Sequence, residues 1–171
     1  MYRNNLNLNI GMNNKRFWLF KTEPSEFSIA HLAASPNQTT SWGGVRNYMA
    51  RNLLRDEVKL GDNVFVYHSS TKDKGIAGIA EITRAAYPDP TAFDPASAYY
   101  DPKSIVSRPT WFAVDIHLIE VFSEIVSLSR LKQTRRLKRM MVCQQGARLS
   151  IQPVAADEWR IICQMARSAF S

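Results

Sequence analysis

The sequence lacks the features that define several common protein classes. Its two cysteines, Cys143 and Cys163, are too few for a framework of disulfide bonds. Its apolar runs are only a few residues long, whereas a membrane-spanning helix needs about 20 consecutive apolar residues. No apolar segment of the signal-peptide type precedes the first predicted strand. We therefore expect a reduced, soluble, cytoplasmic protein with no membrane partner.

The length and composition are those of one folded domain. The chain has 171 residues, of which 45% are hydrophobic. A single domain holds roughly 150 residues, and a chain this apolar buries enough surface to offset the entropy cost of ordering. We predict a single domain over residues 15–171 and a disordered N-terminal tail over residues 1–14.

One segment, residues 125–150, has no acidic side chain although it carries seven basic ones. The remaining residues contain 15 basic and 15 acidic groups, so the whole net charge of +7 belongs to this segment. A concentrated positive charge is typical of a protein that binds phosphates, because each neutralised phosphate releases counterions. A solvated helix face that only aids solubility is the alternative. The candidate phosphate contacts are Arg130, Lys132, Arg135, Arg136, Lys138, Arg139 and Arg148.

The patterns that mark common catalytic and metal sites are also missing. The three histidines, His31, His68 and His117, are far apart, and no HExxH or CxxC motif occurs. Asp115 and His117 share one face of a predicted strand, but a structural pair is the simpler interpretation. Cys143 lies beside the basic run, which would lower its pKa, yet the sequence places no histidine next to it. Nucleophile-elbow and glycine-rich nucleotide-binding motifs are absent. We predict no catalytic residues, no metal and no cofactor.

The apolar pattern favours an α+β fold. Strands are predicted at residues 16–21, 63–69, 75–83 and 110–122, with short helices between them and at the end. The strand at 63–69 is apolar on both faces, which is typical of a central strand covered on both sides. Gly78 in the next strand indicates a bulge or the close approach of a ligand. The pattern predicts a small mixed sheet or a partly closed barrel with helices packed on its rims.

Two local patterns predict helices before the central strands. Ser28 is placed to cap a short helix over residues 28–33. A second helix is predicted after Trp42-Gly43-Gly44, with Val45, Tyr48, Met49 and Leu53 on one apolar face. Residues 87–107, with four prolines and little periodicity, are predicted to be a long loop of the kind that often carries function.

The same Trp42-Gly43-Gly44 segment is a candidate binding site. Glycines before a helix expose backbone N–H groups, which can donate to a carbonyl, a ring nitrogen or a phosphate. Aromatic side chains such as Tyr67, Tyr99 and Tyr100 would add a wall, and aromatic walls with a few oriented donors hold an unstacked nucleobase. The alternative is that Trp42 only packs in the core.

Several motifs in this sequence resemble those of the EVE domain family. They occur in order across residues 16–166, nearly the whole chain, and include WLFKTEPS at 18–25, WGGVRNYMARN at 42–52, YHS at 67–69, YPD at 87–89, YDPKS at 100–104 and RLSIQPV at 148–154.

The resemblance implies a fold, a function and a set of site residues. The fold would be a PUA-like mixed β pseudo-barrel with short helices around it, related to the YTH readers of methylated RNA. The function would be non-catalytic recognition of a modified base, especially a modified cytosine, in DNA or RNA. Gly43 stands where the family usually has an acidic residue, so the base preference stays open. Carried over from the family, the pocket residues would be Trp42, Val45, Asn47, Tyr67, His68 and Ser69, with Lys103 and Ser104 on the rim.

Two other functions remain open at this point. One is a small enzyme that hydrolyses or processes modified nucleosides, with Asp115 and His117 or Lys103 as the groups to test. The other is an adaptor whose basic face binds a protein. The oligomeric state does not follow from the sequence, although a monomer is favoured.

Overall fold

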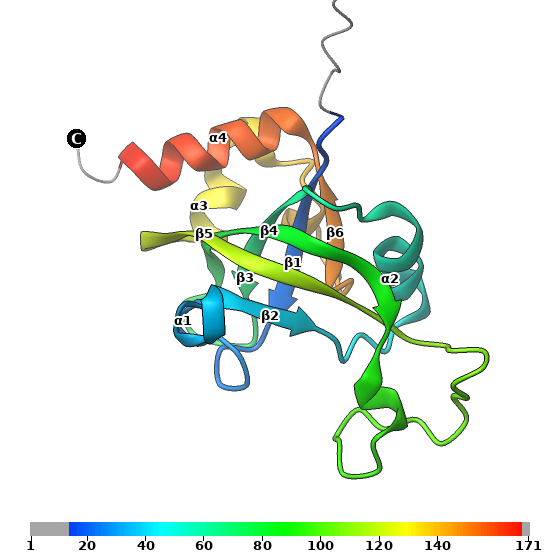
Figure 1. Ribbon diagram of the computed structural model, residues 1–171. Coiled ribbons are helices and arrows are strands. Elements are labelled where there is room, and N and C mark those ends of the chain that lie inside the picture. Colours follow the sequence, from blue (N-terminus) through cyan, green and yellow to red (C-terminus); the bar gives the residue numbers. More distant parts are fainter. Residues whose placement is uncertain (1–13, 169–171) are drawn as a thin grey trace, which may run out of the picture.

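The computed structural model describes residues 14–168 and is built around one six-stranded mixed sheet with the order β2-β5-β4-β3-β1-β6 (Figure 1). Strands β1 and β3 are parallel, and the other neighbouring pairs are antiparallel. The strands are β1 (Phe17–Thr22), β2 (Thr39–Trp42), β3 (Asn63–His68), β4 (Gly75–Pro88), β5 (Phe112–Ser127) and β6 (Ile151–Val154).

The sheet is strongly curved but not closed. Strands β2 and β6 end the strand order at opposite edges. Even so, the rings of Trp42 on β2 and Phe20 on β1 are only 5.6 Å apart, although three strands separate β2 from β1 in the sheet. Curvature of this kind requires irregularities in the ladder, and β4 and β5 change register at four places. The fold is the open, barrel-like α+β arrangement that the sequence predicts.

Gly78 lies at one of these irregularities. A β-carbon on this residue would lie 2.3 Å from the Glu120 carbonyl oxygen, so only glycine allows the backbones of β4 and β5 to approach this closely. The prediction of a bulge is confirmed, and the group that approaches Gly78 is the neighbouring strand.

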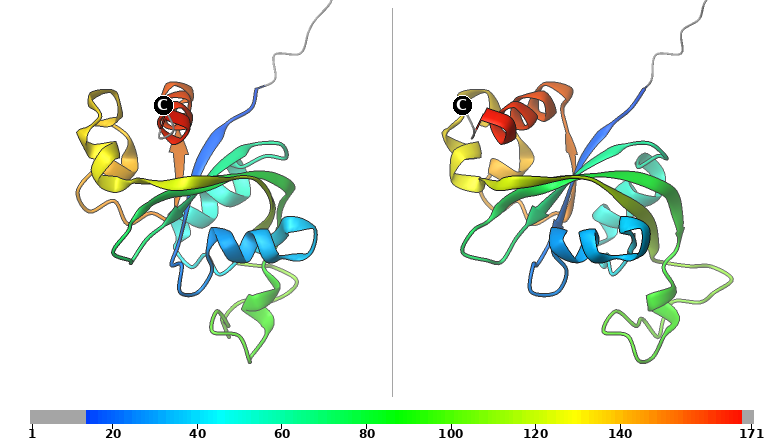
Figure 2. Two further views of the ribbon diagram at one scale, coloured as in Figure 1. Left: turned by 90° about the vertical axis from the view of Figure 1, so that its left-hand side faces the viewer. Right: turned by 60° about the vertical axis from the view of Figure 1, so that its left-hand side comes forward.

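Short helices cover both faces of the sheet (Figure 2). α4 and the segment that follows β5 lie on one face, while α1 and α2 lie on the other. A π-helical turn, Leu53–Glu57, extends α2. The helices are α1 (Ile29–Ala34), α2 (Tyr48–Asn52), α3 (Leu128–Gln133) and α4 (Ala156–Arg167), and the 3₁₀ turns are Pro36–Gln38, Pro90–Phe93, Arg135–Leu137 and Met141–Cys143.

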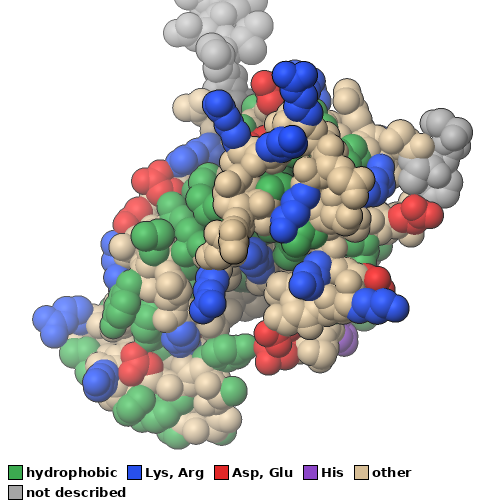
Figure 3. Space-filling view, turned by 180° about the vertical axis from the view of Figure 1, so that it is seen from behind, with side chains coloured by type: hydrophobic (Ala, Val, Ile, Leu, Met, Phe, Trp, Pro, Cys, Tyr) green, Lys and Arg blue, Asp and Glu red, His purple; other side chains and the backbone are tan. Residues whose placement is uncertain are grey.

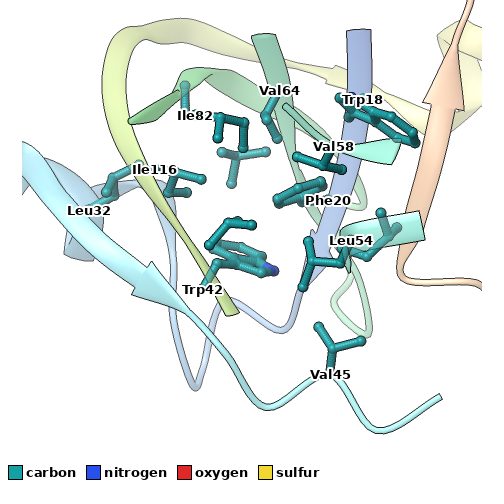
Figure 4. Close-up of a cluster of buried hydrophobic side chains, with 14 of the residues drawn as sticks. Trp18, Phe20, Leu32, Trp42, Val45, Leu54, Val58, Val64, Ile82 and Ile116 are labelled. Carbon is teal, nitrogen blue, oxygen red and sulfur yellow. The ribbon is translucent and has the colours of Figure 1, made fainter. Parts of the chain in front are cut away.

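The two faces of the sheet bury two separate hydrophobic clusters. The first, here the α2-side core, includes Trp18, Phe20 and Trp42, and it is shown in Figure 4. The second, here the α4-side core, includes Phe65 and Trp159, whose rings stack with centroids 3.8 Å apart. Consecutive residues of a strand point to opposite faces, so the doubly apolar pattern of β3 serves both cores. The prediction of a central strand covered on both sides is confirmed.

Several local predictions are also confirmed. The Ser28 side chain caps α1 by accepting a hydrogen bond from the His31 N–H. The strands predicted at 16–21 and 75–83 correspond to β1 and β4.

Other local predictions were wrong. Of the predicted apolar face, Val45 and Leu53 pack on the α2-side core, but Tyr48 and Met49 are 63% and 65% exposed. Ala50 is the one buried residue of α2, and Leu54, four positions later on the same helical face, is buried in the π-helical turn. The loop predicted to begin at Tyr87 is shorter, since β4 continues to Pro88. The short strands β2 and β6 were not predicted.

None of the helices in residues 14–168 is long and apolar enough to cross a bilayer. The predicted tail lies almost wholly outside the described residues, which begin at residue 14.

Candidate functional site

A pocket of about 870 Å³ opens on the α2 side of the sheet, where β1 and β2 end. The parallel pairing of β1 and β3 places Thr22 and Ser69 side by side, with the Ser69 N–H donating to the Thr22 carbonyl at 2.8 Å. The antiparallel pairing of β1 with β6 adds Ser150 to the same edge. The pocket is lined by Lys21, Thr22, Glu23, Glu26, Phe27, Ser41, Trp42, Gly43, Gly44, Val45, Arg46, Asn47, Ser69, Pro90, Thr91, Ala98, Tyr99, Arg148 and Ser150.

Trp42 belongs to both the core and the pocket. Its side chain is 8% exposed and packs against Phe20 (Figure 4). It also contacts Phe27 edge to face, with the ring centroids 6.1 Å apart. The same residue lines the pocket wall. The ring therefore forms a fixed apolar wall, because most of its surface is already covered by the core.

The segment after Trp42 is held by one buried carboxylate. Asp89 is 1% exposed, and its Oδ2 accepts hydrogen bonds from the Gly44 N–H and from Arg46, both at 2.8 Å. Its Oδ1 accepts from the Thr91 N–H and hydroxyl. Burial alone raises the pKa of Asp89, but these hydrogen bonds outweigh it and hold the pKa below its ordinary value. The carboxylate is thus ionised and fully used in shaping the pocket.

Neither Gly43 nor Gly44 has room for a side chain, because groups from other segments approach both residues closely. Gly44 has a φ of +74°, and a β-carbon there would lie 2.9 Å from the Tyr99 ring. A β-carbon on Gly43 would lie 2.9 Å from an Asp89 carboxylate oxygen. Asp89, which belongs to another segment of the chain, therefore places its carboxylate in the space beside Gly43.

The accessible polar groups of the pocket carry both signs of charge. Glu23 and Glu26 are exposed, and the Tyr99 hydroxyl donates to Glu26 at 3.3 Å. The Lys21 ammonium donates to the Ala147 carbonyl at 2.6 Å, and burial lowers its pKa. Hydrogen-bond donors and acceptors thus face one space whose walls include Phe27 and Trp42.

The structure brings together half of the pocket residues predicted from the sequence. Trp42, Val45, Asn47 and Ser69 line the pocket. The Asn47 side chain also caps α2, where its Oδ1 accepts from the Ala50 N–H at 3.0 Å.

The other four predicted pocket residues lie elsewhere. Tyr67 points into the α4-side core, where burial raises its pKa to about 12. His68 is 7% exposed, and its Nε2 accepts the Ile29 N–H at 3.0 Å. Lys103 is exposed on the loop before β5, and the Ser104 hydroxyl accepts from the Thr110 N–H. Adjacent positions on β3 face opposite sides of the sheet, so Tyr67 and His68 cannot both reach one pocket.

The predicted phosphate contacts form an exposed, unneutralised group. All seven are exposed, and within residues 14–168 none lies within ion-pair distance of a carboxylate. The segment is anchored by Leu131, Leu137 and Met140 in the α4-side core. Arg148 alone among the seven lines the pocket. Figure 3 shows Lys and Arg side chains spread across the molecule seen from behind, with acidic side chains mostly near the margins.

A second hollow, of about 820 Å³, lies at the start of α3, where Lys132 meets Lys72 and Lys74. Asp73 and Glu124 line it as well, so its charge is mixed. This hollow and the pocket beside Trp42 share no lining residue.

The groups that the sequence offered for catalysis or metal binding have structural partners. The Tyr87 hydroxyl donates to Asp115 at 2.5 Å, and His117 Nδ1 lies 3.0 Å from both the Thr39 hydroxyl and the Asn37 carbonyl. Burial raises the pKa of the Cys143 thiol and outweighs the nearby lysine, so the thiol is not activated. Within residues 14–168, no three His, Cys, Asp or Glu side chains are grouped as a metal site.

Sequence reasoning missed several pocket residues, including Lys21, Glu23, Glu26 and Phe27. They lie at or just after the end of β1. The sequence carried one signal for these residues: a short polar segment follows the apolar strand, and such segments mark strand ends, where ligands commonly bind. The sequence does not show which strand ends meet, since that depends on the parallel pairing of β1 with β3.

Comparison with known proteins places this architecture in a family. The family model for the EVE domain matches residues 16–165. The chain belongs to the EVE domain family.

Relatives of this EVE domain include proteins from distant organisms. Human thymocyte nuclear protein 1 is 39% identical over 164 residues, which cover 86% of this chain and 72% of the relative. A solved structure of a hypothetical protein from Leishmania major has a TM-score of 0.87 and 41% identity, covering 92% of this chain and 98% of that one. The structure of human THYN1 protein in complex with DNA containing 5-methylcytosine has a TM-score of 0.84 and 38% identity, covering 90% of this chain and 98% of that one.

Proposed function

We propose that this EVE domain is a nucleic-acid-binding module that holds a modified base, a modified cytosine such as 5-methylcytosine, in the pocket beside Trp42. One observation carries the proposal: a pocket with apolar walls and oriented polar groups in a chain 38% identical to a human protein whose structure holds 5-methylcytosine-containing DNA. The proposed role is recognition without catalysis.

The chemistry of the pocket suits a cytosine. The base carries one exocyclic amino donor together with ring and carbonyl acceptors. The exposed carboxylates of Glu23 and Glu26 can accept from the amino group, and the Lys21 ammonium and Ser150 hydroxyl can donate to the acceptors. A methyl group on the ring would contact the apolar wall formed by Phe27 and Trp42. A base inside a duplex would have to leave the stack to enter this pocket.

The seven basic residues of the 130–148 segment are proposed to contact phosphates. Arg148 is the member that connects the two regions, because it lines the pocket. The other six lie outside the pocket, so we assign them an attraction that does not depend on base identity. A partner that carries many phosphates fits this distribution better than a free nucleoside does.

Binding to matched oligonucleotides tests this function. Single- and double-stranded oligonucleotides, each with one central 5-methylcytosine or one plain cytosine, are titrated across a salt series. We expect total affinity to fall as salt rises, because counterion release weakens, while the ratio of affinities for modified and plain strands persists. Equal binding of both strands that vanishes with salt would overturn the pocket assignment.

Charge-matched variants separate the pocket from the general electrostatics. The double variant Glu23→Gln, Glu26→Gln removes two pocket carboxylates, and Glu120→Gln, Glu124→Gln removes two from β5. Both raise the net charge equally. We expect only the first pair to weaken binding of the modified strand relative to a strand with a purine at that position.

Two predictions from the sequence belong with this proposal. Turnover of the modified strand or of free 5-methylcytidine would contradict the non-catalytic role and favour the nucleoside-processing alternative. The cytoplasmic location stays a prediction, and the vertebrate relatives carry the name thymocyte nuclear protein 1.

A further inference from the structure

An aromatic side chain next to the pocket is exposed instead of buried. Tyr48 begins α2, one residue after the pocket residue Asn47, and it is 63% exposed. Met49 beside it is 65% exposed. Exposed apolar side chains are common on protein surfaces, so their exposure matters here because two of them lie together beside a candidate binding site.

The Tyr48 ring is supported on one side only. Its centroid lies 5.0 Å from that of Trp111 in a stacked arrangement, and 5.1 Å from the Arg51 guanidinium. Arg51 and Trp111 are themselves 5.9 Å apart. If they lay on opposite faces of the tyrosine ring, their separation would approach the sum of the other two distances. The two groups therefore do not sandwich the ring, and the 63% exposure of Tyr48 leaves its face away from Trp111 open.

The support beneath Tyr48 is fixed and reaches the pocket. Trp111 is 6% exposed, and its indole N–H donates to the Asp101 carboxylate at 2.7 Å. The Arg46 guanidinium lies 5.3 Å from the Trp111 ring and 5.7 Å from the Tyr99 ring. Arg46 is also the ion-pair partner of Asp89, which shapes the pocket. One arginine thus connects the pocket wall to the base of the Tyr48 stack.

The charge around Tyr48 favours an anionic partner. Arg51 donates to two neutral oxygens, the Asn52 amide oxygen and the Thr110 carbonyl. Lys103 and Arg108 are exposed on the loop that ends at Trp111. Within residues 14–168, none of these three basic groups lies within ion-pair distance of a carboxylate.

We propose that the open face of Tyr48 is a stacking platform for a nucleotide that neighbours the base held in the pocket, with Arg51 contacting the adjoining phosphate. This inference rests on the proposed function and deepens it by defining a second contact along the same strand. An aromatic face that accepts any base, together with a positive charge at the backbone, is how proteins hold a nucleic-acid strand without reading its sequence.

The variant Tyr48→Ala tests the platform, with Leu60→Ala as the matched control. Leu60 is 67% exposed and lies in the turn before β3, so the control removes a similar exposed apolar side chain. Affinities are measured for free 5-methylcytidine and for oligonucleotides with flanking nucleotides on either side of the modified base. We expect Tyr48→Ala to weaken oligonucleotide binding about tenfold, the size of one lost base–aromatic stack. Binding of the nucleoside and the preference for the modified base should not change.

A fluorescence measurement and a rescuing substitution distinguish the loss of stacking from a general loss of binding. A fluorescent purine analogue placed next to the modified base should be quenched on binding the wild-type protein and the Leu60→Ala control, and less so on binding Tyr48→Ala. Tyr48→Phe keeps the ring and should restore both affinity and quenching. Thermal unfolding of each variant reports whether the fold is intact.

The two proposals fail in different ways. If wild-type protein prefers the modified base and Tyr48→Ala binds oligonucleotides as tightly as Leu60→Ala does, the platform is wrong and the pocket stands. If wild-type protein shows no preference for the modified base, the pocket assignment fails, and the platform defined relative to it fails with it.

Discussion

Two regions of this EVE domain differ in how their basic side chains are held. Beside the pocket, Arg46 pairs with the buried carboxylate of Asp89 and contacts two aromatic rings. In the 130–148 segment, seven basic side chains are exposed on short helical turns and a loop, without carboxylate partners among residues 14–168. The first arrangement fixes geometry, and the second supplies unneutralised charge.

This difference has a physical consequence for recognition. Exposed charges attract any polyanion, and salt weakens that attraction. A buried, fully hydrogen-bonded network cannot adapt its shape to different ligands, so it favours one ligand over another. We expect selectivity to follow the pocket network and total affinity to follow the basic segment. The predictions below test that division, from the largest expected effect to the smallest.

Replacing Trp42 with alanine should have the largest effect. The ring is part of the α2-side core, so we expect Trp42→Ala to lower the free energy of unfolding by about 3–5 kcal/mol. Protein that remains folded should lose the preference for a modified cytosine but keep salt-sensitive binding. Urea denaturation and oligonucleotide titration measure the two effects, and Trp42→Phe is the conservative control. Full discrimination by a folded Trp42→Ala protein would show that the pocket is elsewhere.

Removing the Asp89 carboxylate should have the second-largest effect. The variant Asp89→Ala leaves Arg46 without its buried partner and should cost about 3 kcal/mol of stability. Asp157→Ala removes a 68% exposed partner of Arg160 and should cost less than about 1 kcal/mol. Denaturant titration of both variants provides the comparison. Similar costs for the two would mean that the Arg46 network does not organise the pocket.

Neutralising three members of the basic segment should leave stability unchanged. The triple variant Arg135→Gln, Arg136→Gln, Arg139→Gln should bind modified and plain strands more weakly by the same factor. It should also flatten the dependence of log affinity on log salt by about one per residue. The triple variant Arg16→Gln, Arg55→Gln, Arg160→Gln, which removes three cations paired with carboxylates, matches this change in net charge. A changed preference between modified and plain strands would show that this segment also takes part in selection.

The smallest expected effect is a pH dependence from His68. Burial lowers the pKa of His68, whose Nε2 accepts a hydrogen bond from the first residue of α1. The unfolded state, with a pKa near 6.5, therefore binds the proton first as pH falls. The stability contribution is fully present above 6.5 and is lost as pH falls from there toward the lowered pKa. Denaturant titrations across this range should show a slope in the wild type that is reduced in His68→Gln.

Much of the fold could be predicted from the sequence because its local signals agree with the tertiary structure. The apolar pattern of β3, the Ser28 cap and the bulge at Gly78 each follow from nearby residues. The apolar face of α2 was placed wrongly because apolar spacing alone does not show which side of a short helix meets the core: Ala50 and Leu54 are buried, whereas Tyr48 and Met49 are exposed. Strand β2, with the sequence TTSW, becomes a strand only by pairing with β5.

The pocket was predicted less completely than the fold. The Trp42-Gly43-Gly44 segment could be found because glycines beside an aromatic residue are a local signal. Glu26 and Ser150 could not, since strand pairing and the curvature of the sheet bring them together. Tyr67 was predicted both as an aromatic wall and through the family motif, and His68 through the motif alone. The alternation of side chains along β3 directs Tyr67 into the other core.

The position of β1 also determines when the chain can finish folding during synthesis. β1 lies between β3 and β6, and Phe17 pairs with Val154 near the other end of the chain. Until the ribosome has released residues 151–154, one edge of the aromatic strand Phe17–Thr22 has no partner. Unpaired apolar edges associate with other chains. A chain truncated after Ser150 is therefore expected to aggregate, and light scattering of the truncated and full-length proteins would measure how strongly the last strand protects the first.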